Sequence, residues 1–69
     1  MTQNIKITTE YIRLDDLLKV AGLVATGGHA KIVIQGEEVK VNGEICTMRG
    51  KKMRIGDTAE FEGTIITVE

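Results

Sequence analysis

The sequence of 69 residues has no serine, proline or tryptophan, and it holds one cysteine and one histidine. The lack of serine excludes a serine-centred catalytic triad, and a single cysteine cannot form an internal disulfide, which fits a reducing compartment. One cysteine and one histidine also supply too few ligands for a structural zinc site. We therefore expect a protein that is not an enzyme and that has no metal site and no cofactor.

Long apolar runs are absent as well. The longest span three residues, as in Leu23-Val24-Ala25, whereas a membrane helix needs roughly 18. No charged segment followed by an apolar stretch opens the chain, so the pattern of a secretory signal is missing. A chain of this length buries only about 60% of its unfolded surface and has no room for a deep substrate cavity. These features predict a single cytoplasmic domain over residues 1–69, with no membrane partner and no small-molecule substrate.

Basic and acidic residues are unevenly distributed, although the net charge is only −1 and the pI is about 5.8. Residues 31–54 hold six basic and three acidic side chains, whereas residues 55–69 hold four acidic side chains and no basic one. The segment 47–54 contains four bases and no acid, namely Arg49, Lys51, Lys52 and Arg54. Such a cluster produces a local positive field that attracts phosphate backbones. The alternative is a solvated loop balanced by the acidic C-terminal segment.

Helical periodicity appears twice in the first half of the chain. Leu14, Leu17, Leu18 and Ala21 follow the spacing of one helix face and predict a helix over residues 13–21, with Gly22 just beyond its end. Thr26 is a candidate N-cap for a second helix over residues 28–35. The β-branched run 32–34 leaves a strand open as an alternative there.

After Gly36 the apolar period changes from 3.6 to 2. Strands are predicted over 39–41 and 44–46, joined by an Asn42-Gly43 turn, and then over 53–55, 58–62 and 64–68. Ile5 and Ile7 alternate with polar residues and predict an edge strand. The expected fold class is α+β: two short N-terminal helices followed by a small, mostly antiparallel twisted sheet.

The start of the second predicted helix offers a candidate phosphate site. The absent side chains of Gly27 and Gly28 would let a phosphate reach the free N–H groups there. Lys31 follows Gly28 by three residues and therefore lies on the same helix face. The alternative is that the two glycines only form a tight turn between the helices.

Aromatic residues are scarce. Only Tyr11 and Phe61 are present, and Phe61 alternates with polar neighbours as a core residue does. Because single-stranded nucleic acid is bound on sheet faces with exposed aromatics, we expect no base-stacking platform. Recognition by charge and shape of a structured RNA is the remaining option.

Taken in order, four motifs resemble the S4-like RNA-binding domain, also called the alpha-L motif. They are Arg13-Leu14-Asp15 with Leu18, Ala30-Lys31 with Val33-Ile34, Val39-Lys40-Val41-Asn42-Gly43, and Gly56-Asp57. The resemblance spans about residues 12–62 and is greatest to the small stand-alone bacterial members of the YaaA/YbcJ type. Two positions differ from the family pattern: Gly27 stands where an arginine is common, and Gly36 falls one residue early.

The resemblance implies a fold in which two helices and the following hairpin form an L-shaped surface that holds RNA by its backbone. It implicates Lys31, Lys40 and Asn42, although Asn42 is also the natural first residue of an Asn-Gly turn. The expected function is a non-catalytic module that binds structured RNA, such as rRNA or a ribosome-assembly intermediate, within ribosomal particles. The predicted RNA-binding residues are Gly28, Lys31, Lys40, Asn42, Arg49, Lys51, Lys52 and Arg54.

Two other functions share features with this sequence. A protein-interaction module could use the same basic loop to bind an acidic partner. A β-grasp carrier protein shares the Val-Asn-Gly and Gly-Asp turns, but it needs a C-terminal Gly-Gly, and this sequence ends in Ile66-Thr67-Val68-Glu69.

Overall fold

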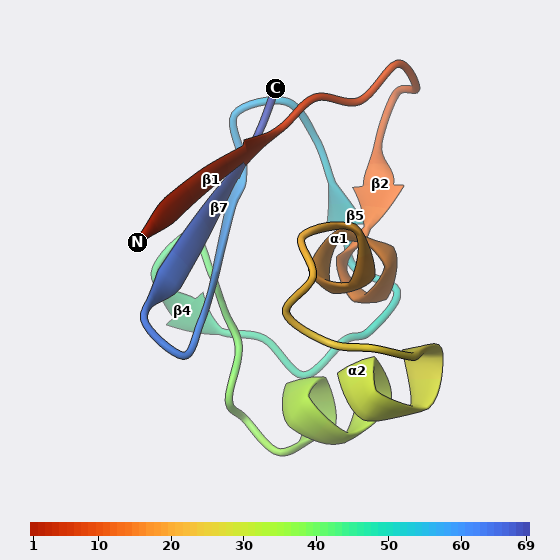
Figure 1. Cartoon of the computed structure of the whole chain (residues 1–69), viewed down its shortest axis with the longest axis vertical. Helices are drawn as coiled ribbons and strands as arrows, with labels where there is room; N and C mark the ends of the chain where they lie inside the picture. The colour runs from red at the N-terminus through yellow and green to blue at the C-terminus, as the bar shows by residue number, and fades with distance from the viewer.

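The computed structural model describes all residues from Met1 to Glu69 and contains two helices and seven strands. In chain order the elements are β1 Thr2–Ile5, β2 Ile12–Arg13, α1 Leu14–Val20, α2 Gly27–Gln35, β3 Lys40–Val41, β4 Glu44–Ile45, β5 Lys52–Met53, β6 Thr58–Phe61 and β7 Thr64–Val68. Figure 1 shows a sheet layer on one side of the molecule and the two helices on the other. The predicted α+β class is therefore correct.

The strands form two sheets, whereas one was expected. The main sheet has the order β1-β7-β6-β3-β4, and β2 pairs with β5 in a separate antiparallel ribbon. The main sheet is mixed. Strand β1 runs parallel to β7, whereas the pairs β7–β6, β6–β3 and β3–β4 are antiparallel. The segment 53–55 was predicted as one more strand after the helices, but Lys52–Met53 turns away to pair with the residues just before α1.

The prediction that both helices are N-terminal is wrong, because β1 and β2 precede them. The edge strand expected near Ile5 and Ile7 exists, but it ends at Ile5. Strand β1 pairs in parallel with β7, which lies at the other end of the chain. The alternation of apolar and polar residues within a short segment does not specify such a distant partner. The half-buried side chains of Gln3 and Ile5 then alternate with the exposed Thr2 and Asn4 along this edge.

Helix α1 begins and ends close to the predicted positions. Leu14, Leu17 and Leu18 are fully buried, and the left-handed residue after the helix is Gly22 at φ +77°. Gly22 N donates to Lys19 O at 3.0 Å and Leu23 N donates to Leu18 O at 3.1 Å. These two hydrogen bonds together form the Schellman motif, which glycine accommodates without steric cost.

Helix α2 is confirmed, and a strand over residues 32–34 is excluded. Thr26 caps it, since its Oγ1 accepts a hydrogen bond from His29 N at 3.0 Å. The helix ends in a second Schellman motif, with Glu37 N bonded to Ile34 O and Glu38 N bonded to Val33 O. The left-handed position of this motif holds Glu37 at φ 64°, because Gly36 falls one residue before it.

Glycine is needed at position 36 for a different reason than at position 22. Its φ is −80°, which any residue adopts, but a Cβ there would lie 2.9 Å from the carbonyl oxygen of Ile32. The close approach of backbone to backbone therefore demands glycine at 36, and the left-handed residue that follows is a strained glutamate.

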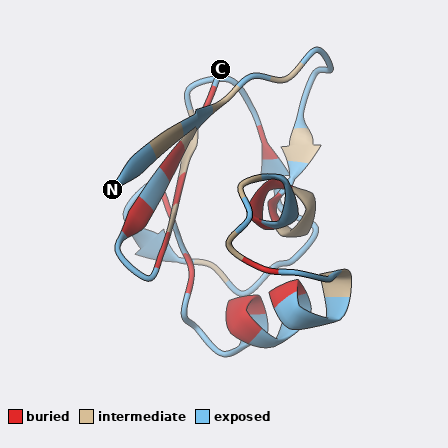
Figure 2. Cartoon of the chain, in the orientation of Figure 1, coloured by how far each residue is buried: buried red, intermediate tan, exposed pale blue.

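The hydrophobic core lies between the main sheet and the two helices (Figure 2). Phe61 is 3% exposed, which confirms its predicted place in the core. Fourteen buried apolar side chains make up the cluster: Leu14, Leu17, Leu18, Val24, Ala30, Val33, Ile34, Val39, Val41, Met53, Ala59, Phe61, Ile66 and Val68. Met53 belongs to this core, and its burial attaches the β2–β5 ribbon to the rest of the fold.

Candidate nucleic-acid interface

The β2–β5 ribbon presents cations and one aromatic ring on a single face. Ile12 pairs with Met53 and Arg13 pairs with Lys52. Because side chains alternate along a strand, Ile12 and Met53 point toward the core, while Tyr11, Arg13, Lys52 and Arg54 are exposed. Extending the register by one residue sets Tyr11 opposite Arg54. This outward face of Tyr11, Arg13, Lys52 and Arg54 is called the ribbon face below.

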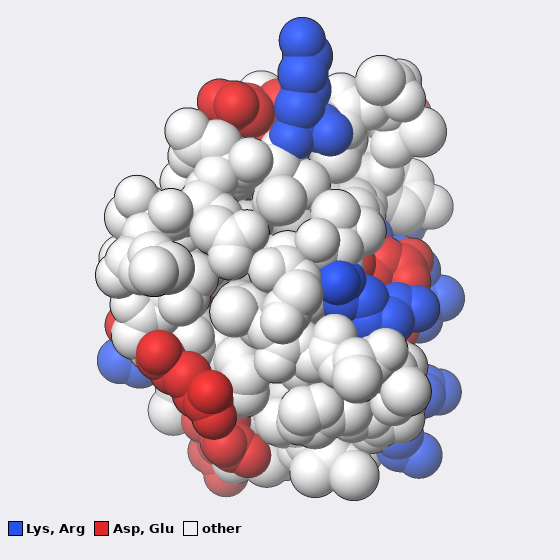
Figure 3. Space-filling model, viewed as in Figure 1, with Lys and Arg blue, Asp and Glu red and all other residues white.

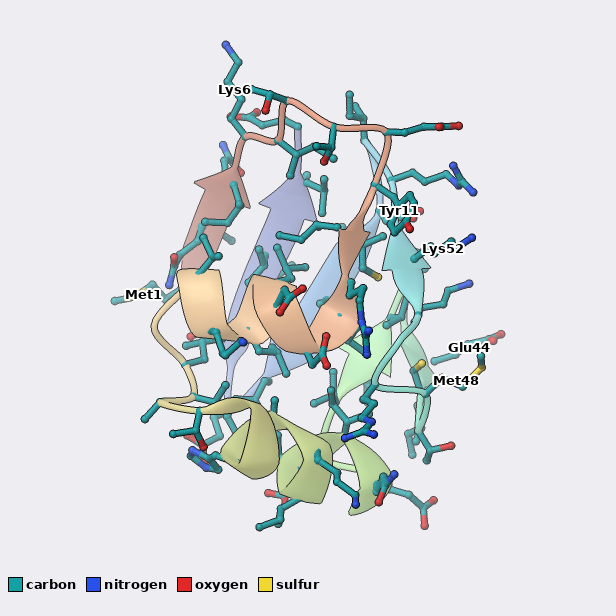
Figure 4. The ribbon with its side chains drawn as sticks, turned by 90° about the vertical axis from the view of Figure 1, so that its right-hand side faces the viewer. Met1, Lys6, Tyr11, Glu44, Met48 and Lys52 are labelled. Atoms are coloured by element: carbon teal, nitrogen blue, oxygen red, sulfur yellow. The ribbon has the colours of Figure 1, made fainter.

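Tyr11 lies among the cations of the ribbon face. Its ring is 5.0 Å from Lys52 Nζ and 5.9 Å from Arg54 Cζ, measured to the ring centroid. Figure 4 shows Tyr11 and Lys52 projecting side by side from neighbouring strands. Tyr11 comes directly before β2 and is 37% exposed, so one aromatic side chain is accessible where none was expected. The ribbon pairing that brings Tyr11 to Lys52 was not visible in the sequence.

The basic loop before β5 is attached to the start of α1 by its backbone. Arg49 O accepts a hydrogen bond from Asp15 N at 3.1 Å, and Lys51 O accepts one from Leu14 N at 2.9 Å. These carbonyls satisfy N–H groups that have no intrahelical partner, and no side chain caps α1. The guanidinium of Arg13 packs on Gly50, where a Cβ would stand 3.6 Å away. The loop cations are therefore held beside the ribbon face.

Most of the predicted cations have no carboxylate partner. The structure contains three ion pairs: Arg13 with Asp15 at 3.3 Å, Lys19 with Asp16 at 3.2 Å, and Arg54 with Glu10 at 3.7 Å. Of the six predicted cations only Arg54 takes part in one; the other five are Lys31, Lys40, Arg49, Lys51 and Lys52. Figure 3 shows Lys and Arg gathered along the right-hand side of the molecule, and an acidic row at the lower left. The positive side is the one turned toward the viewer in Figure 4.

The start of α2 is open to solvent. A Cβ on Gly27 would meet nothing within 4 Å, and one on Gly28 would meet only Thr26 Oγ1 at 3.8 Å. Neither glycine has a positive φ, so neither the turn nor the packing around it requires glycine. Lys31 is exposed one turn further along α2.

Lys40 lies in strand β3 of the main sheet and Asn42 in the turn that follows it, so neither is on the ribbon face. Lys40 is directly opposite Glu60 on the neighbouring strand β6, on the side of the sheet away from the buried Val41. This acidic neighbour could not be predicted from the sequence, because the contact depends on the β3–β6 register.

The Asn42 side chain is bonded within the protein. Its Oδ1 accepts from Thr58 N at 2.9 Å, and its Nδ2 donates to Asp57 Oδ1 at 3.2 Å. Asp57 Oδ2 in turn accepts from Arg54 N at 2.8 Å. The bond from Arg54 N, assisted by Asn42 and the charge of Lys51, lowers the pKa of the Asp57 carboxyl below its ordinary value, and slight burial opposes this. The Asn-Gly and Gly-Asp motifs thus form one hydrogen-bonded unit.

Two hollows border this side of the molecule. One, of about 520 Å³, lies beside β4 and is lined in part by Ile45, Met48 and Lys51. The other, of about 490 Å³, is lined by Thr9, Glu10, Tyr11, Ile12, Arg13 and Asp16. No group of three or more His, Cys, Asp or Glu side chains is placed to hold a metal ion, and neither helix has the length and apolar character to cross a membrane.

Comparison with known proteins identifies the family to which this fold belongs. The model of the S4 domain family matches residues 5–69, so the chain belongs to the S4 domain family. A Bacillus subtilis (strain 168) relative named "Probable ribosome maturation protein RlbA" is 43% identical over 63 residues, which cover 91% of this chain and 89% of the relative. An Escherichia coli (strain K12) relative named "Putative RNA-binding protein YbcJ" is 38% identical over 58 residues, which cover 84% and 83% of the two chains. Neither name states a catalytic activity. The family resemblance seen in the sequence is confirmed.

Proposed function

We propose that this protein binds structured RNA, namely rRNA or a ribosome-assembly intermediate, by holding its phosphate backbone on the ribbon face and the adjoining loop. The observation that carries the proposal is the group of unpaired cations at Arg49, Lys51 and Lys52. A cation without a carboxylate partner need not give up an ion pair when it meets a phosphate. The names of the two relatives, which refer to RNA binding and to ribosome maturation, support the choice of RNA and of the ribosome. This function places the protein in the cytoplasm.

The rigidity of the site favours backbone recognition. The carbonyls of Arg49 and Lys51 are bonded to the start of α1, and Lys52 is fixed by its strand pairing with Arg13. A backbone that holds the attachment points of these cations at set positions suits the regular phosphate spacing of a duplex or junction better than that of a flexible strand. Since phosphate contacts carry no base information, specificity would come from the shape of the RNA.

The start of α2 would add a further phosphate contact. Gly27 and Gly28 leave the helix N-terminus accessible, and Lys31 lies on the same helix face. Backbone N–H groups and the helix dipole both favour an anion there. Lys40, which faces Glu60, would contribute less than the loop cations.

The salt dependence of binding tests the electrostatic mechanism. If four to six phosphates are neutralised, the logarithm of affinity should fall with the logarithm of salt concentration at a slope of roughly −3 to −5. The assay is a titration of a structured rRNA fragment, duplex DNA and single-stranded RNA at several salt concentrations. A slope near zero would contradict the proposal, and binding only to acidic proteins after nuclease treatment would replace it.

Charge-changing variants locate the surface. Lys52→Gln should weaken RNA binding and reduce the magnitude of the salt slope by about 0.9, which is the share of one phosphate contact. The matched control is Lys6→Gln, because Lys6 is also exposed and projects from the upper left of the molecule in Figure 4, apart from Tyr11 and Lys52 on the right. Equal effects of the two variants would show that only net charge matters and that the ribbon face is not the binding surface.

A further inference from the structure

The lining of the hollow beside Tyr11 holds two carboxylates, Glu10 and Asp16, and one cation, Arg13. Lys52 and Arg54 lie on the other strand of the ribbon, close to the Tyr11 ring. One oxygen of each carboxylate is in an ion pair, Glu10 with Arg54 at 3.7 Å and Asp16 with Lys19 at 3.2 Å, and the second oxygen of each accepts no hydrogen bond within the protein. Carboxylate oxygens do accept hydrogen bonds from the exocyclic amino groups of bases, as Asp and Glu do toward the amino group of cytosine.

Tyr11 lines this hollow and is not part of the hydrophobic core. It is 37% exposed, and the buried side of the ribbon is made by Ile12 and Met53. The backbone that carries the ring is held on both sides, by the bond from Thr9 Oγ1 to Tyr11 O at 2.8 Å and by the pairing of β2 with β5. An accessible aromatic ring on a backbone held in place, beside a concave space with hydrogen-bond acceptors, matches what a single base requires.

We propose that this hollow receives one unpaired base that bears an exocyclic amino group, stacked on Tyr11, while the ribbon cations hold the flanking phosphates. The proposal rests on the RNA-binding function proposed above and defines its substrate class further: a duplex interrupted by an unpaired adenine or cytosine. Lys52 is solvent-exposed where it contacts the ring. Its ammonium group can therefore move to a phosphate, and the ring face is then free to stack on the base.

The first experiment compares hairpin RNAs with the same stem, either fully paired or carrying one unpaired cytosine or one unpaired uridine. We expect tighter binding of the cytosine RNA than of the paired stem. Replacing Tyr11 by alanine should weaken binding of the cytosine RNA by roughly 5- to 150-fold, the range that corresponds to stacking of one base. Tyr11→Phe should retain this preference, because it keeps the ring.

A matched control and a direct reporter accompany these variants. Met48→Ala removes another exposed apolar side chain, from the hollow beside β4, and should leave the preference unchanged. Tyr11 is the only tyrosine and there is no tryptophan, so the intrinsic emission reports Tyr11 alone. Stacking should quench this emission with the cytosine RNA and not with the paired stem. Thermal unfolding of each variant checks that it is folded.

The outcomes separate this proposal from the one it rests on. Equal binding of paired and unpaired RNAs by a protein that still shows the expected salt slope would refute the base site and leave the RNA-binding function standing. A preference for the unpaired RNA that survives in Tyr11→Ala would refute it too, since the cause would then be RNA deformability. Equal affinity for cytosine and uridine would refute the role of Glu10 and Asp16. Failure to bind any RNA would refute both proposals.

Discussion

Replacing Asn42 should reveal how much of the stability depends on the contact between its turn and the Gly56-Asp57 turn. Asn42 is left-handed at φ 51°, and its side chain bonds Thr58 N at 2.9 Å and Asp57 Oδ1 at 3.2 Å. These groups are exposed, so each bond contributes the lower part of the usual range, about 0.5 kcal/mol. Asn42→Gly loses these two bonds, together with a longer one from Thr58 Oγ1 to Asn42 Oδ1 at 3.4 Å, and keeps a relaxed backbone, which predicts a loss of about 1 kcal/mol.

Asn42→Ala loses the same bonds and in addition places a Cβ in the left-handed region, which adds about 1 kcal/mol. The total of about 2 kcal/mol lowers the melting temperature by roughly 8–16 °C for a domain of this size. Circular dichroism during heating and urea denaturation measure both variants. Melting temperatures equal to that of the unmodified protein would refute the role of the hydrogen bonds, and a glycine variant less stable than the alanine variant would refute the role of the backbone.

The same variants test the predicted contact of Asn42 with RNA. Its acceptor and its amide donor both have partners within the protein. We therefore expect that the folded Asn42→Gly protein, measured well below its melting temperature, binds structured RNA within about threefold of the unmodified protein. A larger loss would establish Asn42 as a contact to the RNA as well as a turn residue.

Two further predictions concern stability. Glu37→Gly should stabilise the protein by about 0.5–1 kcal/mol, because it removes the strain of a left-handed glutamate in the α2 Schellman motif. Gly22→Ala, at the equivalent position of α1, should destabilise the protein by about 1 kcal/mol. Melting temperatures equal to that of the unmodified protein would contradict both predictions. The lowered pKa of Asp57 stabilises the fold fully above the ordinary value of 3.8, and this contribution disappears as the pH falls through the folded-state pKa. The free energy of unfolding should therefore decline more steeply below about pH 4 in the unmodified protein than in Asp57→Asn, and parallel curves would refute the assignment.

Most of the elements were predictable because their signals are local. The leucines of α1 and the cap at Thr26 repeat or act within one or two helical turns, and both helices formed near the expected positions. The Asn42-Gly43 turn has both residues left-handed, as its composition predicts. The family assignment also followed from short motifs in a fixed order, and the match over residues 5–69 confirms it.

The candidate site was predictable only in part. The basic segment was visible as composition, and its cations are indeed mostly without carboxylate partners. Tyr11 and Arg13 were missed, because nothing near them in the sequence marks them as neighbours of Lys52 and Arg54. A search for alternation around Ile12 would have indicated an outward face at 11 and 13, but not the strand that pairs with it.

The helices, the turns and the concentration of positive charge could be located from the sequence alone, since each depends on residues within a few positions of one another. Which distant segments meet could be known only from the folded structure. Burial of Ile12 and Met53 on the core side draws β2 and β5 together, and that pairing sets Tyr11 among cations some forty residues away. The bond between Asn42 and Asp57 has the same origin: register in the main sheet brings β3 beside β6. Such contacts are chosen by the packing of the whole core, which no local pattern contains.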